Sequence, residues 1–143
     1  MATCRNRAEA TAQSFQNGWF QTGDIAVLED GYYRIMGRQS VDIIKSGGYN
    51  LSALDIESVL LQHPSIVEFA VVGTDDSTWG EAVAVALVTK PWQPLDLESL
   101  RAWCRDKLSQ YKLPKRLQVV DQLPRNAMGK VTKPAVQDLF QQP

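Results

Sequence analysis

Residues 123–133 read LPRNAMGKVTK, and the rest of the chain is most readily interpreted from this stretch outward. At its centre is Gly129-Lys130, between apolar segments, so we expect a turn that carries the lysine side chain away from the domain. A lysine ammonium is a compact point charge on a long stem, suited to bonding phosphate or carboxylate oxygens. Most surface lysines are only solvated, however, so the pair by itself is a weak indication of function.

The composition predicts a folded, soluble protein. The chain has 143 residues, of which 44% are hydrophobic, enough for one domain, or for a small domain joined to the end of another. Its longest uninterrupted apolar run, Ala82 to Val88, is too short to cross a bilayer. Residues 1–14 contain no apolar segment of the kind found in secretory signals. We therefore expect a soluble intracellular protein with no membrane span.

The net charge of −1 hides an asymmetry along the chain. Residues 1–100 hold thirteen acidic and six basic side chains, whereas residues 101–143 hold nine basic and three acidic ones. A basic C-terminal third predicts an anionic partner, although a solvated helix face would give the same counts. No aromatic residues alternate with the bases as in nucleic-acid-binding segments. A nucleotide or CoA phosphate is thus favoured as the anion, and no nucleic acid is expected.

The cysteines and the single histidine give no metal-site pattern. Cys4 and Cys104 are a hundred residues apart, which matches no metal-ligand spacing. One disulfide is conceivable, and buried thiols are the alternative, because Cys104 falls among apolar positions of an expected helix. His63 precedes Pro64 at an expected helix end, where capping is a more common role than catalysis. No metal ligand is predicted.

The N-terminal part has one clear structural signal, a β-hairpin. Trp19 to Leu28 and Tyr32 to Met36 have strand character, and the sequence Glu29-Asp30-Gly31 between them favours a turn. Residues 1–14 have little periodicity and predict no strong element.

The remaining residues predict an α+β domain, a small mixed sheet with about three packed helices. Ser52 is expected to cap a helix that Pro64 ends, with Asp55 as its capping-box partner, and Asp96 is expected to cap a second helix. The expected strands span 41–45, 66–74, 81–90 and 117–120, and the second and third helices span 97–108 and 133–140.

Four stretches in this order resemble the C-terminal end of the adenylate-forming enzymes, a family of acyl-CoA synthetases, luciferases and peptide-synthetase adenylation domains. They are GWFQTGD at 18–24, GR at 37–38, IKSGGYNLSALDIE at 44–57 and LPRNAMGKVTK at 123–133. The resemblance implies that residues 1–39 are the hairpin end of a large N-terminal AMP-binding domain. It also implies that residues 40–143 form a small C-terminal lid domain, which rotates about a hinge at Ser40. The family usually has Asp or Lys at the hinge position, so serine is a departure.

In this family a carboxylate attacks the α-phosphate of ATP, giving an acyl-adenylate and pyrophosphate. The resemblance implies that Lys130 serves this step by bridging the carboxylate and the nucleotide, which stabilises charge in the transition state. It also implies that Asp24 and Arg38 contact the ribose of ATP; a carboxylate can accept two hydroxyl hydrogen bonds. The phosphate loop of the large domain has no counterpart in this sequence, so most of the ATP and its Mg²⁺ would be held by that domain.

In the second step of the family's reaction, the thiol of CoA displaces AMP and forms a thioester. The resemblance implies that Gly47, Gly48 and Tyr49 then line the tunnel for the pantetheine arm of CoA. Without the other motifs, an ordinary hairpin before a helix would be the simpler interpretation of these residues.

Within the family, the stretches SVDIIKSGGYNLSALDIES, HPSIVE and YKLPKRL look most like the malonyl-CoA synthetases. The resemblance therefore implies a ligase for malonate or a similar short carboxylic acid, cytoplasmic or mitochondrial, with the large domain as its partner. This chain alone is expected to be inactive. Two alternatives stay open: a stand-alone binding or regulatory module, and a relative that loads a carrier protein or oxidises its adenylate.

Overall fold

A five-stranded sheet forms the centre of the C-terminal body (residues 43–141) in the computed structural model, which describes residues 5–141. The central strand is β8, which pairs antiparallel with the long edge strand β7 on one side and parallel with β9 on the other. At the start of β8, Gly80 pairs with Ser46 of β5, which extends the sheet to β6. The strands are β5 (Ile43–Ser46), β6 (Tyr49–Ser52), β7 (Ile66–Asp76), β8 (Gly80–Thr89) and β9 (Arg116–Val119).

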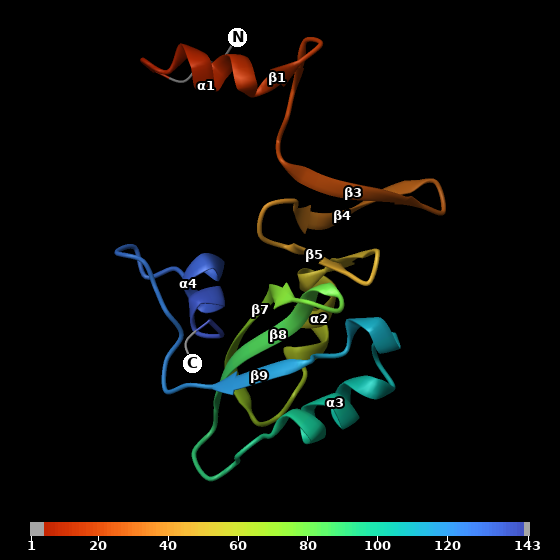
Figure 1. The fold of residues 1–143 in the computed structure, drawn as a ribbon, viewed down its shortest axis with the longest axis vertical. Helices are drawn as coiled ribbons and strands as arrows, with labels where there is room; N and C mark the ends of the chain where they lie inside the picture. The colour runs from red at the N-terminus through yellow and green to blue at the C-terminus, as the bar shows by residue number, and fades with distance from the viewer. Residues whose placement is uncertain (1–4, 142–143) are drawn as a thin grey trace.

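Both faces of β7 and β8 are buried, which explains their nearly continuous apolar sequence. Helices α2 (Ala53–Leu60) and α3 (Leu97–Arg105) cover one face, and α4 (Lys133–Asp138) covers the other, as Figure 1 shows. Alternate residues point to each side: Val83 and Val85 join the cluster with Ile56 and Leu100, whereas Ala84 packs in the cluster of α4. The predicted α+β fold is confirmed, and so is the presence of both long strands.

The two expected helix caps have different outcomes. Asp96 caps α3 as predicted, because its Oδ1 accepts a hydrogen bond from the Ser99 amide at 2.7 Å. Ser52 occupies the cap position of α2, but its hydroxyl donates to the Met36 carbonyl instead of capping the helix. Asp55 pairs with a lysine and an arginine, so the expected capping box is wrong.

The N-terminal segment (residues 5–38) is divided more finely than predicted. Its elements are α1 (Ala8–Gln13), β1 (Phe15–Gln16), β2 (Trp19–Phe20), β3 (Asp24–Glu29) and β4 (Tyr32–Arg38). The expected strand over 19–28 is interrupted because Gly23 has a φ of +79°, outside the β region. Residues 8–13 form a helix where none was expected; its alanines favour helix despite the short length.

Figure 1 shows α1 and β1 standing apart from the sheet, with the β3–β4 hairpin between them and the C-terminal body. Four aromatic side chains of this segment are largely exposed; they are Trp19, Phe20, Tyr32 and Tyr33. The hairpin is tied to α2, since Arg34 Nη1 lies 3.0 Å from Asp55 Oδ1. No helix within residues 5–141 is long and apolar enough to cross a membrane.

Cys104 is a free, buried thiol on α3, and burial raises its pKa. This agrees with the buried-thiol interpretation for that residue, whereas Cys4 lies outside the described residues. His63 follows the end of α2, where its Nδ1 accepts a hydrogen bond from the Ser65 amide at 3.1 Å. Burial, and then the nearby Lys107 charge, lower the pKa of His63.

Candidate functional site

Gly47 and Gly48 form the two-residue turn between β5 and β6. Their φ angles, +59° and +83°, are left-handed and favour glycine, as in a type I′ hairpin. The Gly47 amide donates to the Trp79 carbonyl at 2.8 Å, and a Cβ on Gly47 would lie 3.0 Å from the Trp79 ring. A Cβ on Gly48 would meet no atom within 4 Å. The turn is therefore closed against Trp79 on one side and open at Gly48.

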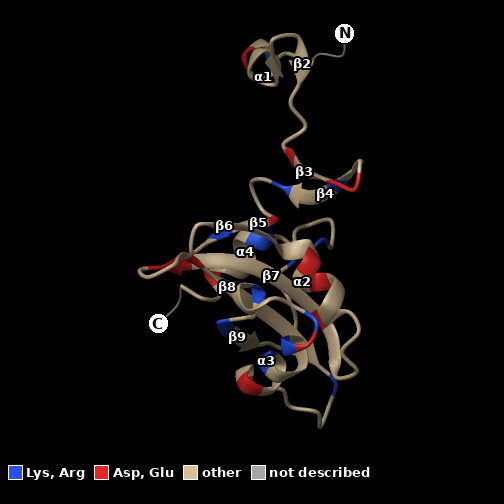
Figure 2. Cartoon of the chain, turned by 90° about the vertical axis from the view of Figure 1, so that its right-hand side faces the viewer, with Lys and Arg blue, Asp and Glu red and all other residues tan. Residues whose placement is uncertain are grey.

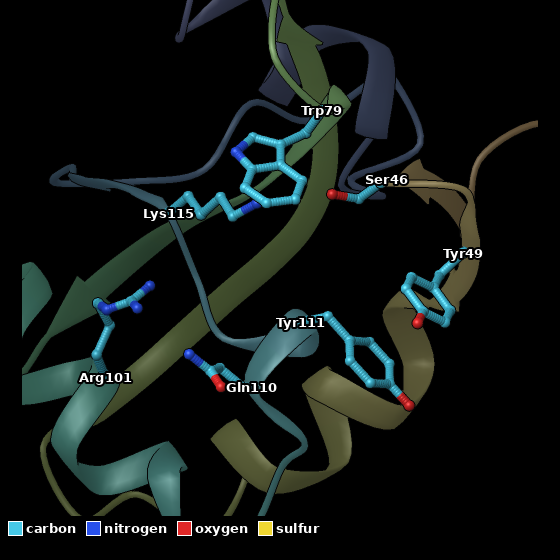
Figure 3. A pocket seen from close by; sticks show the side chains of 8 residues that line it. Ser46, Tyr49, Trp79, Arg101, Gln110, Tyr111 and Lys115 are labelled. Carbon is cyan, nitrogen blue, oxygen red and sulfur yellow. The ribbon is translucent and has the colours of Figure 1, made fainter.

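A pocket of about 360 Å³ lies beside this turn. Figure 3 shows side chains from separate parts of the chain converging on it. The rings of Tyr49 and Tyr111 stack with their centroids 4.6 Å apart, and the Lys115 ammonium lies 3.7 Å from the Trp79 ring centroid. The lining residues are Ser46, Gly47, Tyr49, Trp79, Arg101, Gln110, Tyr111 and Lys115.

The pocket combines aromatic walls with positive charge. Burial, and to a smaller extent the Arg101 charge, lower the pKa of Lys115, while Asp76 acts in the opposite direction. Arg101 is held in place by a hydrogen bond from Nη1 to the Pro114 carbonyl. It also lines a neighbouring hollow of about 330 Å³ with Arg105. Flat aromatic rings beside fixed cations are suited to a ligand with an aromatic base and phosphate groups.

Sequence reasoning missed Trp79, Arg101, Tyr111 and Lys115 as site residues. The usable signal was the excess of bases after residue 100, in particular the stretch YKLPKR at 111–116. Figure 2 shows the basic segments spread over α3, β9 and α4. Of these bases, only Arg101 and Lys115 line the pocket beside the Gly47 turn, and their approach to it depends on contacts between segments far apart in sequence.

Lys130 lies on the turn that was predicted for it. The turn closes through a bridge between Arg125 and Val131, and the Asn126 side chain accepts hydrogen bonds from the Met128 and Lys130 amides, both at 3.0 Å. The Lys130 side chain is exposed, and within residues 5–141 its ammonium has no recorded hydrogen bond or ion pair. A rigid backbone thus presents a free cation.

The Lys130 turn and the Gly47-Gly48 turn lie on different sides of the C-terminal body. In Figure 1 the blue segment between β9 and α4 is at the left, and the yellow turn after β5 is at the right.

Asp24 and Arg38 are cross-strand partners in the β3–β4 hairpin. Arg38 Nε lies 3.8 Å from Asp24 Oδ1, and both side chains are accessible to solvent. The structure therefore brings these two predicted residues together. Ser40 is exposed in the turn over residues 39–42, which connects the hairpin to β5. No group of three or more His, Cys, Asp or Glu side chains in the described part of the chain is placed to hold a metal ion.

The family model of the AMP-binding enzyme C-terminal domain matches residues 55–130. The human mitochondrial malonate–CoA ligase ACSF3 is 46% identical over 132 residues, which are 92% of this chain and 23% of the relative. The 2-succinylbenzoate–CoA ligase of Geobacillus kaustophilus is 44% identical over 89% of this chain and 26% of its own length. The chain thus spans about a quarter of the length of these curated relatives.

Among solved structures, MatB from Rhodopseudomonas palustris is 33% identical, with 95% of this chain and 27% of that chain covered. The TM-score is 0.82 for its ATP-bound structure and 0.71 for its apo structure. The same relative in two states therefore matches the present arrangement to different degrees.

Proposed function

We propose, from the premise that this chain belongs to the AMP-binding enzyme C-terminal domain family, that it serves a carboxylate–CoA ligase. The C-terminal body would be the mobile small domain of the AMP-forming enzyme, and residues 1–39 the end of its large domain. One observation carries the proposal: a free lysine on a rigid turn lies on one side, and an open glycine turn beside a cationic, aromatic pocket lies on another.

In the first half-reaction, a carboxylate oxygen attacks the α-phosphate of ATP, and the bond to pyrophosphate breaks. Lys130 places its ammonium between the two anions, which reduces their repulsion and stabilises the charge of the transition state. The Asp24 carboxylate and the Arg38 guanidinium bind the ribose hydroxyls. Because Lys130 has no competing partner in the described residues, it needs no internal ion pair to break before it binds substrate.

In the second half-reaction, the sulfur of CoA attacks the acyl carbonyl, and the bond between the acyl carbon and AMP oxygen breaks. The pantetheine arm passes Gly48, where the backbone has open space. Lys115 and Arg101 bind phosphate groups of CoA, and the Trp79 and Tyr111 rings bind its adenine. These assignments agree with the expected role of Gly47 to Tyr49 and extend it to the pocket.

Alternation between the half-reactions would require rotation of the C-terminal body about Ser40. The ATP-bound form of the relative MatB matches this chain better than the apo form does. We infer that the present arrangement corresponds to the nucleotide-bound, adenylate-forming one.

Malonate or a similar short acid is the proposed substrate, because the human relative at 46% identity is a malonate–CoA ligase. The relative from Geobacillus acts on 2-succinylbenzoate at a similar identity of 44%. Those residues of the family that contact the acid belong mainly to the large domain. We therefore assign the acid from the relative and not from any side chain of this chain.

A chimera tests the proposal. The large domain of a malonate–CoA ligase, joined to this chain in place of its own C-terminal segment, should form malonyl-CoA from malonate, ATP and CoA. The large domain alone and this chain alone serve as controls, and neither should form the thioester. Failure of the folded chimera to form either the adenylate or the thioester would contradict the proposed function.

A further inference from the structure

One carboxylate connects the two sides of the Ser40 turn. Asp42 Oδ1 accepts a hydrogen bond from the Lys133 ammonium at 2.8 Å, and Asp42 Oδ2 accepts one from the Arg38 backbone amide at 2.9 Å. The side chains of Asp42 and Lys133 are only 14% and 17% exposed, so solvent screens their ion pair weakly. Asp42 therefore joins the end of β4 to the first residue of α4.

A second carboxylate fixes Lys133 inside the C-terminal body. Lys133 Nζ lies 3.0 Å from Glu57 Oε1 on α2, and the same oxygen accepts a hydrogen bond from the Val71 amide of β7 at 3.2 Å. Lys133, Glu57 and Val71 all belong to the C-terminal body. Lys133 is thus a fixed support that holds the Asp42 carboxylate in one orientation.

The backbone of β4 packs closely on Asp42. A Cβ added to Gly37, whose φ is +127°, would lie 2.5 Å from the Asp42 Cβ. The Asp42 amide also donates to the Arg38 carbonyl at 2.8 Å. Three contacts of Asp42 therefore connect it to residues that precede Ser40, namely Gly37 and Arg38. Its fourth partner, Lys133, follows Ser40 in the chain.

We propose that Asp42 is a positioning residue that latches the β3–β4 hairpin to the C-terminal body, and that Lys133 and Glu57 hold this latch in place. The role in turnover rests on the proposed function. Rotation about Ser40 has to break the contacts of Asp42 with Gly37 and Arg38, while the Lys133–Glu57 pair can stay intact. The latch thus stabilises the arrangement that presents Lys130 and fixes the backbone of Arg38.

Two further contacts cross this junction: a hydrogen bond from the buried Ser52 hydroxyl to the Met36 carbonyl, and the more exposed ion pair between Arg34 and Asp55. Arg34, which pairs with Asp55, has a side chain that is 43% exposed, so water and salt weaken that pair more than the Asp42 pair. Arg34→Gln is therefore a matched control that removes a junction ion pair without touching the latch.

Amide hydrogen exchange of the 143-residue chain tests the latch directly. In Lys133→Met, the Arg38 and Asp42 amides should exchange about tenfold faster relative to the core amides of Val85 and Leu87, the effect of one lost charged hydrogen bond. Asp42→Asn should give a similar selective increase, and it keeps the test valid if Lys133→Met does not fold. Lys133→Arg should restore most of the protection.

Two control variants separate the latch from general destabilisation. Arg116→Gln removes the 3.1 Å ion pair with Asp76 on the sheet and should accelerate junction and core amides by the same factor. Arg34→Gln should change the exchange rates of the Arg38 and Asp42 amides at the junction by less than threefold. If Lys133→Met and Asp42→Asn also raise junction and core exchange equally, the latch does not exist as proposed.

The chimera described above tests the role in turnover. Asp42→Asn should lower the rate of adenylate formation severalfold relative to the rate of thioester formation from preformed malonyl-adenylate. Equal changes in both rates would show that the latch has no role in alternation. If the unmutated chimera has neither activity, the proposed function fails, while the exchange measurement still decides whether the latch exists.

Discussion

Gly47 and Gly48 are neighbours in one turn but have different surroundings. Gly47 cannot accept a Cβ without moving the Trp79 ring, whereas Gly48 has open space and only a left-handed φ to limit substitution. The hairpin that the sequence allowed at these residues is present, because β5 and β6 pair across the Gly47-Gly48 turn. The bounds of its second strand, β6, could not be predicted, because the four residues Tyr49–Ser52 are too few to show a periodic pattern.

Lys130 and Lys115 show what sequence can predict about a site. Lys130 follows a glycine in a local turn, and the Arg125–Val131 bridge and the hydrogen bonds to the Asn126 side chain that shape this turn come from neighbouring residues. The Lys115 ammonium instead packs against the ring of Trp79, which lies 36 positions earlier in the sequence. A site residue in a local motif can therefore be predicted from the sequence, whereas a pocket assembled from distant segments cannot.

Asp42 should make folding stability depend on pH. Burial acts to raise the pKa of its carboxyl group, but the hydrogen bonds from Lys133 and the Arg38 amide outweigh burial and lower it. The folded protein therefore binds this proton less tightly than the unfolded chain. The stability from Asp42 is complete above the ordinary aspartate pKa of about 4 and is lost as the pH falls below it.

Urea denaturation from pH 7 to pH 3 checks this prediction. At pH 7, Asp42→Asn should lower the free energy of unfolding by about 1–3 kcal/mol, as for hydrogen bonds to charged groups. The difference from the unmutated chain should shrink toward pH 3. A difference that stays constant over this range would mean that the Asp42 charge does not contribute.

At the scale of elements, the helix caps show where local patterns are insufficient. The Asp96 side chain accepts a hydrogen bond from the Ser99 amide of the helix that it precedes, so the local prediction is correct. The Ser52 hydroxyl instead donates to the Met36 carbonyl of β4, a group that a pattern over residues 52–55 does not include. Where β4 packs against the start of α2, a tertiary hydrogen bond therefore replaces the expected helix cap.

Asp96→Ala should destabilise the protein by about 1 kcal/mol through loss of the α3 cap. Asp96→Asn keeps an acceptor oxygen and should retain most of the stability, which makes it the matched control. The free energy of unfolding at pH 7 is the measurement. Equal losses in the two variants would show that the charge, and not the cap hydrogen bond, is what stabilises α3.

Strand length sets how well the sheet can be predicted. The eleven residues of β7 and the ten of β8 have enough apolar positions to be recognised. β1 and β2 have two residues each and depend on one pairing ladder, with Phe15 opposite Phe20 and Gln16 opposite Trp19. Such short ladders are specified by their turn and not by a pattern of their own.

At the scale of the whole molecule, the C-terminal body has a core and the N-terminal segment has little. The body buries residues on both faces of β7 and β8, while none of the residues of α1 is buried. An isolated two-stranded hairpin is marginally stable in water. We therefore expect the residues from about Val41 onward to fold independently.

Limited proteolysis checks this expectation. Chymotrypsin should cut first within residues 1–40, at exposed sites such as Trp19 and Phe20, and leave a resistant fragment that begins near Val41. The Arg34–Asp55 pair and the Asp42 contacts should slow cuts within β3 and β4 relative to those before Gly23. Early cleavage inside 66–89 would place the stable core elsewhere.

We propose that two sides of one small domain serve the two successive half-reactions. Lys130 and Gly48 belong to these different sides, and neither side chain position contributes to the buried core. Substitutions at the two positions should therefore affect different steps.

The most direct measurement compares both half-reactions in Lys130→Ala and Gly48→Leu variants of the chimera. Lys130→Ala should slow malonate-dependent pyrophosphate exchange by roughly 10²–10³-fold, as for loss of a charge-stabilising group, and should spare thioester formation from preformed malonyl-adenylate. Gly48→Leu should give the reverse pattern, with exchange retained and CoA transfer impaired. If both variants slow both half-reactions equally, the division of labour between the two sides is wrong.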